Sequence, residues 1–158
     1  MKLKNFAFLM FWILLPLFAG FLGSIATYPN IPTWYAALNK PSFNPPNWIF
    51  GPVWTTLYIL MGWAAYLISQ KGWKNKEVKI ALTIFIAQLA LNILWSFIFF
   101  GQHLLLVAFI EIIILWLFIL WTILKFYPLS KLAAWLLMPY ILWVSFASFL
   151  NLSIWMIN

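Results

Sequence analysis

The stretch from Trp34 to Tyr58, WYAALNKPSFNPPNWIFGPVWTTLY, decides the fold because it interleaves prolines with large aromatic residues. Pro41, Pro45 and Pro46 interrupt its first half. Each fixes φ, lacks a backbone donor and pushes the preceding residue towards extended geometry. The stretch is too aromatic for a solvated linker and too rich in proline to cross a membrane. We therefore predict a stiff, non-helical loop over residues 27–47 that covers an aromatic pocket formed by the rest of the chain.

The composition indicates an integral membrane protein. The chain has 158 residues, of which 66% are hydrophobic and 7% charged, whereas a soluble domain carries about 25% charged residues. Cysteine and arginine are absent, and the net charge of +7 comes from lysines. The lack of cysteine excludes disulfides and thiolate metal sites. Lysines confined to loops and ends indicate membrane topology rather than nucleic-acid binding.

We predict one all-α domain, residues 1–158, that is a bundle of five membrane-spanning helices. About 20 apolar residues cross a bilayer, and runs of this length lie at about 5–26, 48–69, 80–100, 104–124 and 132–157. The first run could instead be a signal peptide, since Lys2 and Lys4 precede it, but it exceeds the usual apolar length of about 7–15 residues. Its Gly20-x-x-x-Ser24 pattern is typical of closely packed membrane helices. One hypothesis is that this pattern forms the contact between two copies of the chain in a dimer.

Lysine placement predicts the orientation. Eight lysines fall at the N-terminus or in the loops after the second and fourth spans, namely Lys2, Lys4, Lys71, Lys74, Lys76, Lys79, Lys125 and Lys131. Only Lys40 lies on the opposite side. Positive residues accumulate on the cytoplasmic side, so we expect a cytoplasmic N-terminus, with the proline loop, the His103 turn and the C-terminus outside. We favour a bacterial plasma membrane.

Three spans carry functional groups at four-residue intervals, which places them on one helix face. They are Trp54, Tyr58 and Gly62 in the second span, Gln88, Asn92 and Ser96 in the third, and Pro139, Trp143, Ala147 and Asn151 in the fifth. Flat aromatic rings mixed with a few polar groups are typical of pockets for flat, mostly apolar ligands. The alternative is structural: polar residues in membrane helices bond neighbouring helices, at about 0.6 kcal/mol each, and aromatic residues fill cores.

Two titratable residues stand apart from these faces. Glu111 is the only acid within a predicted span, and a charge there costs on the order of 2.5–3.5 kcal/mol. We expect a structural hydrogen bond to another helix, with proton-coupled transport as the alternative. His103 is the single histidine and is predicted to be a turn residue, with haem ligation as the alternative. No triad, carboxylate pair or phosphate-binding glycine loop is present, so we expect neither a hydrolase nor a kinase, and no metal site.

Four segments together resemble a known family in order and spacing. They read WYxxLxKPSFxPP at 34–46, GPVWxxLYxxMG at 51–62, LNxxWSxxFFG at 91–101 and PYxxWxxFAxxLN at 139–151. On these motifs the chain resembles the TspO/MBR family, the translocator proteins also called peripheral-type benzodiazepine receptors and tryptophan-rich sensory proteins. The resemblance implies five transmembrane helices, commonly paired as a homodimer.

The resemblance also implies a ligand pocket beneath the first loop, for porphyrins such as protoporphyrin IX, haem-like tetrapyrroles and benzodiazepine-type or isoquinoline molecules. The family's pocket positions fall on Trp34, Tyr35, Trp54, Asn92, Trp143 and Ala147, and the helix-face argument adds Tyr58. Some members break down protoporphyrin in light, and Trp54 and Trp143 are then the expected participants. The tyrosine and basic residue of the animal members' proposed sterol motif are absent from residues 150–158, so we expect no tight sterol binding.

The main hypothesis is a membrane receptor or carrier for tetrapyrroles that requires no cofactor, with Lys40 or backbone N–H groups meeting the ligand's carboxylates. It could serve tetrapyrrole regulation or transport. One alternative is light-dependent porphyrin degradation in the same pocket, which is the only enzyme-like activity we consider. The other is a small exporter that uses Glu111. The expected partners are thus a flat hydrophobic molecule, the lipid bilayer and a second copy of the chain.

Overall fold

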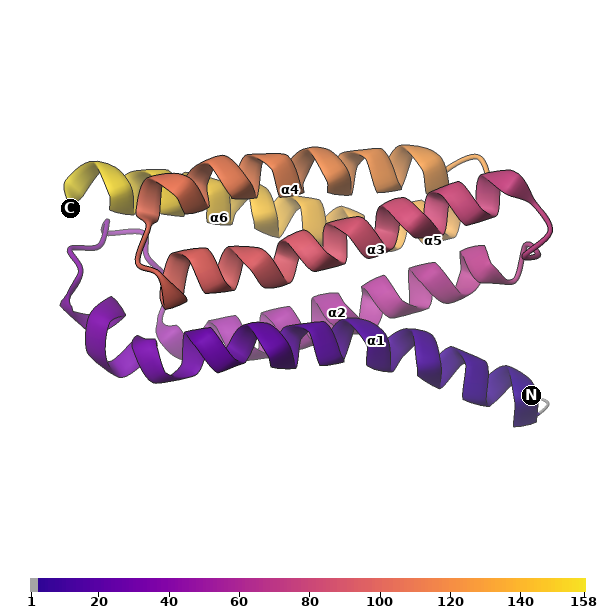
Figure 1. The fold of residues 1–158 in the computed structure, drawn as a ribbon, viewed down its shortest axis with the longest axis horizontal. Coiled ribbons are helices and arrows are strands. Elements are labelled where there is room, and N and C mark those ends of the chain that lie inside the picture. The colour runs from indigo at the N-terminus through magenta and orange to yellow at the C-terminus, as the bar shows by residue number, and fades with distance from the viewer. Residues whose placement is uncertain (1–2) are drawn as a thin grey trace.

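The computed structural model describes residues 3–158, which form long helices running along one axis (Figure 1). Four are continuous: α1 (Leu3–Thr27), α2 (Asn47–Ser69), α3 (Lys76–Ser96) and α4 (Leu105–Phe126). The last span consists of α5 (Lys131–Leu136) and α6 (Met138–Ile157). No strand occurs among the described residues, and five helical stretches are long and apolar enough to cross a membrane. The predicted fold class, an all-α membrane bundle with five spans, is confirmed.

The helical conformation does not stop where the loop was predicted to begin. A 3-10 turn, Tyr28–Asn30, and a π-helical turn, Ile31–Tyr35, extend α1. Pro29 and Pro32 each lie in the first positions of one of these turns, where a missing N–H costs little. The predicted loop of 27–47 is therefore too long, because its first residues are helical. Irregular backbone is confined to about 38–46, which holds Pro41, Pro45 and Pro46.

The fifth span, predicted over 132–157, contains a break at Leu137. Pro139 cannot donate the backbone hydrogen bond that an unbroken helix would give to the carbonyl of Trp135. Instead, the N–H of Leu137 bonds the carbonyl oxygen of Ala134 at 3.1 Å, and α6 starts afresh. The third span starts earlier than predicted, because the side chain of Asn75 accepts a hydrogen bond from the N–H of Glu77 and caps α3.

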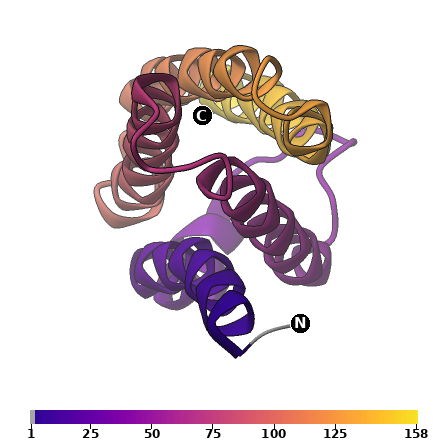
Figure 2. The same cartoon turned by 90° about the vertical axis from the view of Figure 1, so that its right-hand side faces the viewer.

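The helices form a closed ring in the order α1, α2, α5/α6, α4, α3 (Figure 2). The N-terminus lies at one end of the bundle, together with the α2–α3 and α4–α5 connections (Figure 1). We call this the lysine-rich end, because Lys71, Lys74 and Lys131 lie in or beside those connections. The other end holds the C-terminus, the α3–α4 turn and residues 28–46. We call residues 28–46 the cap and this end the cap end.

Small residues bring α1 against its neighbours. A Cβ on Gly62 of α2 would lie 2.5 Å from both the Cα of Ile13 and the carbonyl oxygen of Trp12, so the two backbones touch there. A Cβ on Gly20 would collide with the ring of Tyr58. Gly20 is therefore an internal packing position, whereas Ser24 is exposed. The proposal that both form a dimer contact does not fit this arrangement.

Candidate functional site

A cavity of about 530 Å³ lies within the cap-end half of the bundle. All five spans contribute to its wall. The side chains that give it its character are Tyr35 of the cap, Trp54, Thr55 and Tyr58 of α2, Asn92, Trp95 and Ser96 of α3, and Trp143, Ala147 and Asn151 of α6. The volume falls within the range of about 300–1,000 Å³ that is usual for small-molecule sites.

Six of the seven predicted ligand-binding residues line this cavity: Tyr35, Trp54, Tyr58, Asn92, Trp143 and Ala147. Trp34 does not. Its indole stacks on the ring of His103, with centroids 4.1 Å apart and planes 14° apart, and it packs edge-on against Phe99. Successive residues in a helical turn point in directions about 100° apart. With Tyr35 directed into the bundle, Trp34 therefore points towards the α3–α4 turn.

A chain of hydrogen bonds begins at Tyr58 and Asn92, which line the cavity, and continues to buried side chains behind its wall. The hydroxyl of Tyr58 donates to Oδ1 of Asn92 at 2.7 Å, and Nδ2 of Asn92 donates to the hydroxyl of Tyr140 at 3.1 Å. Tyr140 in turn donates to Oε1 of Gln88 at 2.9 Å. The chain joins α2, α3 and α6. Sequence reasoning found three of these residues but missed Tyr140, whose only signal was its place in the PYxxW motif.

Aromatic rings cover the walls between these polar groups. Trp54 and Tyr58 stack with centroids 5.5 Å apart, as their spacing predicts, and Trp95 stacks on Phe99 at 4.9 Å. The indole N–H of Trp95 donates to Oδ1 of Asn151 at 3.2 Å. The indole N–H of Trp143 has no hydrogen-bond partner among residues 5–158. This N–H is buried, so Trp143 offers the cavity its ring surface rather than its donor.

The cap closes the cavity through Tyr35, not through its prolines. Tyr35 is buried and donates from its hydroxyl to Oδ1 of Asn44 at 2.8 Å. Nζ of Lys40 lies 4.9 Å from the centroid of the same ring and donates to the carbonyl oxygens of Ala36 and Leu38. Lys40 does not line the cavity. It satisfies the carbonyls at the end of a helical segment, so the expectation that it meets ligand carboxylates at the mouth does not fit this geometry.

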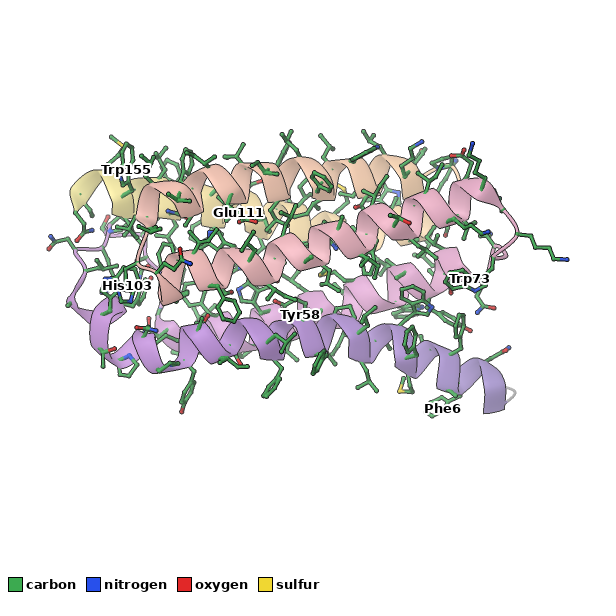
Figure 3. The ribbon with its side chains drawn as sticks, in the orientation of Figure 1. Phe6, Tyr58, Trp73, His103, Glu111 and Trp155 are labelled. Atoms are coloured by element: carbon green, nitrogen blue, oxygen red, sulfur yellow. The ribbon has the colours of Figure 1, made fainter. Side chains whose placement is uncertain are left out.

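Neither of the two isolated titratable residues reaches the cavity. Nε2 of His103 lies 3.1 Å from Oδ1 of Asn30, and His103 takes a φ of 60°, which histidine tolerates better than most residues. Glu111 lies on α4 (Figure 3) and is 6% exposed. Both its carboxylate oxygens lack a partner among residues 5–158. The predicted hydrogen bond from Glu111 to another helix is therefore not formed. No cluster of metal-binding side chains occurs in the described part of the chain.

These features define an integral membrane protein of five spans with an aromatic internal cavity. A sequence profile of the TspO/MBR family matches residues 12–156. The chain is 47% identical to the tryptophan-rich protein TspO of Chlorobaculum tepidum over 88% of each chain. It is 37% identical to the human translocator protein, over 94% of this chain and 89% of that one. It is 36% identical to the tryptophan-rich sensory protein of Cereibacter sphaeroides, over 94% of each chain. The chain belongs to the TspO/MBR family.

Proposed function

We propose that this protein is a membrane receptor or carrier for porphyrins and other flat, mostly apolar molecules, including benzodiazepine-type ligands. One observation supports it most directly: Trp54, Trp95 and Trp143, from three different helices, line one cavity of about 530 Å³. Indole rings offer large flat surfaces for stacking, together with a single polar N–H. A tetrapyrrole is roughly as wide as a helix with its side chains, about 10–12 Å, so it requires a cavity shared by several helices.

The polar groups of the cavity suit a ligand whose polar edge faces the cap end. Ser24, Thr27, Asn47 and Thr55 line the cavity in that half of the bundle, whereas the Tyr58–Asn92 pair lies deeper. Lys40 is engaged with the cap's own carbonyls. The hydroxyls of Ser24, Thr27 and Thr55 each donate to a carbonyl oxygen of their own helix. We therefore infer that ligand carboxylates are met by the side-chain amide of Asn47 rather than by an ion pair. Replacing Lys40 with alanine should then leave porphyrin affinity within about twofold, a difference of about 0.4 kcal/mol.

The test is a titration of intrinsic tryptophan fluorescence with protoporphyrin IX in detergent or nanodiscs. The unmodified protein should show saturable quenching. A Trp54→Phe/Trp143→Phe variant should bind at least about tenfold more weakly, a loss of about 1.4 kcal/mol. The matched control is Trp121→Phe/Trp135→Phe, because these two indoles are exposed and lie away from the cavity. Equal affinity in both double variants would remove the aromatic cavity from the proposal.

Light-dependent porphyrin degradation is a second candidate for the same cavity. The observation that favours degradation is that Trp54 and Trp143, two oxidisable indoles on separate helices, both line the cavity. A porphyrin bound there would lie between them, so electron transfer from indole to excited porphyrin would need no rearrangement. The exporter alternative has less support, because Glu111 does not line the cavity.

The lysine distribution supports the proposed orientation. The described lysines other than Lys40 cluster at the lysine-rich end, so we infer that this end is cytoplasmic and that the cap faces outward, in a bacterial plasma membrane. A homodimer remains our expectation from the family. Cysteines placed singly at Lys74 and Phe43 should report the orientation by their reaction with an impermeant reagent, because the sequence has no other cysteine.

A further inference from the structure

We propose that ligands enter the cavity sideways from the membrane, through an opening between α1 and α2, and not through the cap. The inference rests on the proposed function and adds to it the class of ligand: a flat, amphipathic molecule that dissolves in the bilayer before it binds. We call this the side opening. One edge is formed by Phe21 and Ser24 of α1 and by Tyr28, the first residue of the cap, and the other by Trp48, Gly51 and Thr55 of α2.

The exposure of the cavity residues locates the opening. The six residues of the side opening line the cavity and are also exposed, including Phe21 at 62%, Tyr28 at 81% and Trp48 at 74%. In contrast, no cavity residue from α3, α4 or α6 is exposed. The cavity thus has a complete wall on three helices and an incomplete one between α1 and α2. Exposed positions on membrane-spanning helices face lipid, so this opening faces the bilayer.

The crossing of α1 and α2 explains the gap. The two backbones touch at Gly62, where a Cβ would meet Ile13 at 2.5 Å. Three turns nearer the cap end, a Cβ on Gly51 would find no atom within 4 Å. The two helices are therefore in backbone contact at one level and apart at the other, so they diverge towards the cap end. Gly51, Ser24 and Thr55 at the edges of the gap have small side chains, which leave the gap unfilled.

The cap, by contrast, is fastened to the helices around it. The backbone N–H of Asn39 donates to Oδ1 of Asn158 at 3.0 Å, and Nδ2 of Asn158 donates back to the carbonyl oxygen of Asn39 at 3.0 Å. Phe43 stacks on Phe149 of α6 with centroids 5.2 Å apart. Access through the cap requires these contacts to break, whereas access through the side opening requires none of them to break.

The chemistry of the opening selects the ligand. The hydroxyl of Ser24 donates to the carbonyl oxygen of Phe21 at 2.7 Å, and that of Thr55 donates to the carbonyl oxygen of Gly51 at 2.9 Å. Both hydroxyls have therefore already used their hydrogen atoms within their own helices. The large side chains at the edges are aromatic, and tryptophan and tyrosine favour the boundary between lipid and water. A passing molecule must consequently be mainly apolar, with any charged group kept at that boundary.

The first experiment measures rates of porphyrin association by stopped-flow quenching, with protoporphyrin IX presented in phosphatidylcholine vesicles. Gly51→Phe should obstruct the opening and lower the association and dissociation rates together, by about tenfold or more, within the one to three decades over which such rates vary among variants. Thr56→Phe is the matched control, because Thr56 is exposed on α2 but does not line the cavity. An Asn39→Cys/Asn158→Cys variant, cross-linked across the cap, should associate at the unmodified rate.

The opposite pattern would overturn the side opening: a cross-linked cap that slows association tenfold, with Gly51→Phe no slower than Thr56→Phe.

A second experiment needs no porphyrin. A single Ala147→Cys in the cavity wall should react with a bilayer-soluble pyrene maleimide, and Gly51→Phe, but not Thr56→Phe, should slow that reaction. If porphyrin fails to bind while this slowing is seen, the proposed function fails and the side opening stands. If porphyrin binds and Gly51→Phe has no effect on labelling, only the side opening fails.

Discussion

The hydroxyl of Tyr58 on α2 donates a hydrogen bond of 2.7 Å to Oδ1 of Asn92 on α3. Each residue lies on a face that also lines the cavity, so this bond fixes the floor of the cavity and the distance between two of its walls. Asn92 is held in turn by Tyr140. The polar groups of the floor are therefore bonded to one another, and a ligand meets mainly aromatic surface.

Tyr58→Phe should destabilise the protein by about 0.6 kcal/mol and by no more than about 1.7, the range for hydrogen bonds between membrane helices. The ring stays against Gly20, so only the hydroxyl is lost. Thermal denaturation in detergent measures the change. Tyr28→Phe is the control, because the hydroxyl of Tyr28 lies on a side chain that is 81% exposed. Equal melting temperatures for the two variants would show that the bond contributes nothing.

Gly62→Ala should be far more damaging than its size suggests. The added methyl would lie 2.5 Å from backbone atoms of Trp12 and Ile13, and backbone cannot rotate away as a side chain can. We expect a loss of about 1–3 kcal/mol, as for other overpacked sites, measured by unfolding in a denaturing detergent. Gly51→Ala has open space around its Cβ and should leave stability unchanged or raise it slightly. A reversed order of the two variants would contradict the crossing of α1 and α2.

His103→Ala should loosen the cap without unfolding the bundle. The change removes the ring that stacks on Trp34 and the contact with Asn30. Aromatic pairs contribute about 0.5–1.5 kcal/mol beyond burial, so amide hydrogens of residues 31–38 should exchange about 2- to 10-fold faster. Hydrogen exchange followed by mass spectrometry measures this. Gln102→Ala, at the exposed neighbouring position, is the control. Unchanged exchange in the His103 variant would show that the cap is held by its other contacts alone.

Glu111→Gln should not reduce stability, because the carboxylate oxygens of Glu111 have no partner among residues 5–158 to lose. Removal of a group that is costly to charge in the membrane could raise the free energy of unfolding by up to about 2.5 kcal/mol. Porphyrin affinity should stay the same, since Glu111 does not line the cavity. Flux measured in proteoliposomes distinguishes the exporter hypothesis: flux abolished by Glu111→Gln, with binding intact, would support a proton-coupled role for this residue.

Trp143→Phe should separate porphyrin binding from porphyrin degradation. Phenylalanine keeps an aromatic surface, so affinity should fall by less than about tenfold, but it is harder to oxidise than indole. If the cavity degrades porphyrin, illumination should give a new absorbing product with the unmodified protein and much less with this variant. Trp121→Phe, outside the cavity, should behave as the unmodified protein. Equal product from free porphyrin in detergent would show that the protein takes no part.

The sequence by itself determined the membrane class, the five spans and the non-helical character of Pro41, Pro45 and Pro46. It also placed Trp54 and Tyr58 on one face, because helical periodicity fixes which residues share a face. These features depend on local backbone chemistry and on apolar length, which a single segment carries in full. They hold whatever neighbours the segment meets.

Only the tertiary structure decided which neighbour each face meets. In a membrane, lipid is as apolar as the core, so hydrophobicity does not distinguish an outward face from an inward one. Trp34 was expected in the cavity from the family's pocket positions, and the sequence alone could not show that its ring stacks on His103 instead. For the same reason the buried hydrogen bonds of Tyr140 were missed. It is also why the gap beside Gly51 could not be predicted. Each follows from the approach of segments distant in sequence, which no single segment encodes.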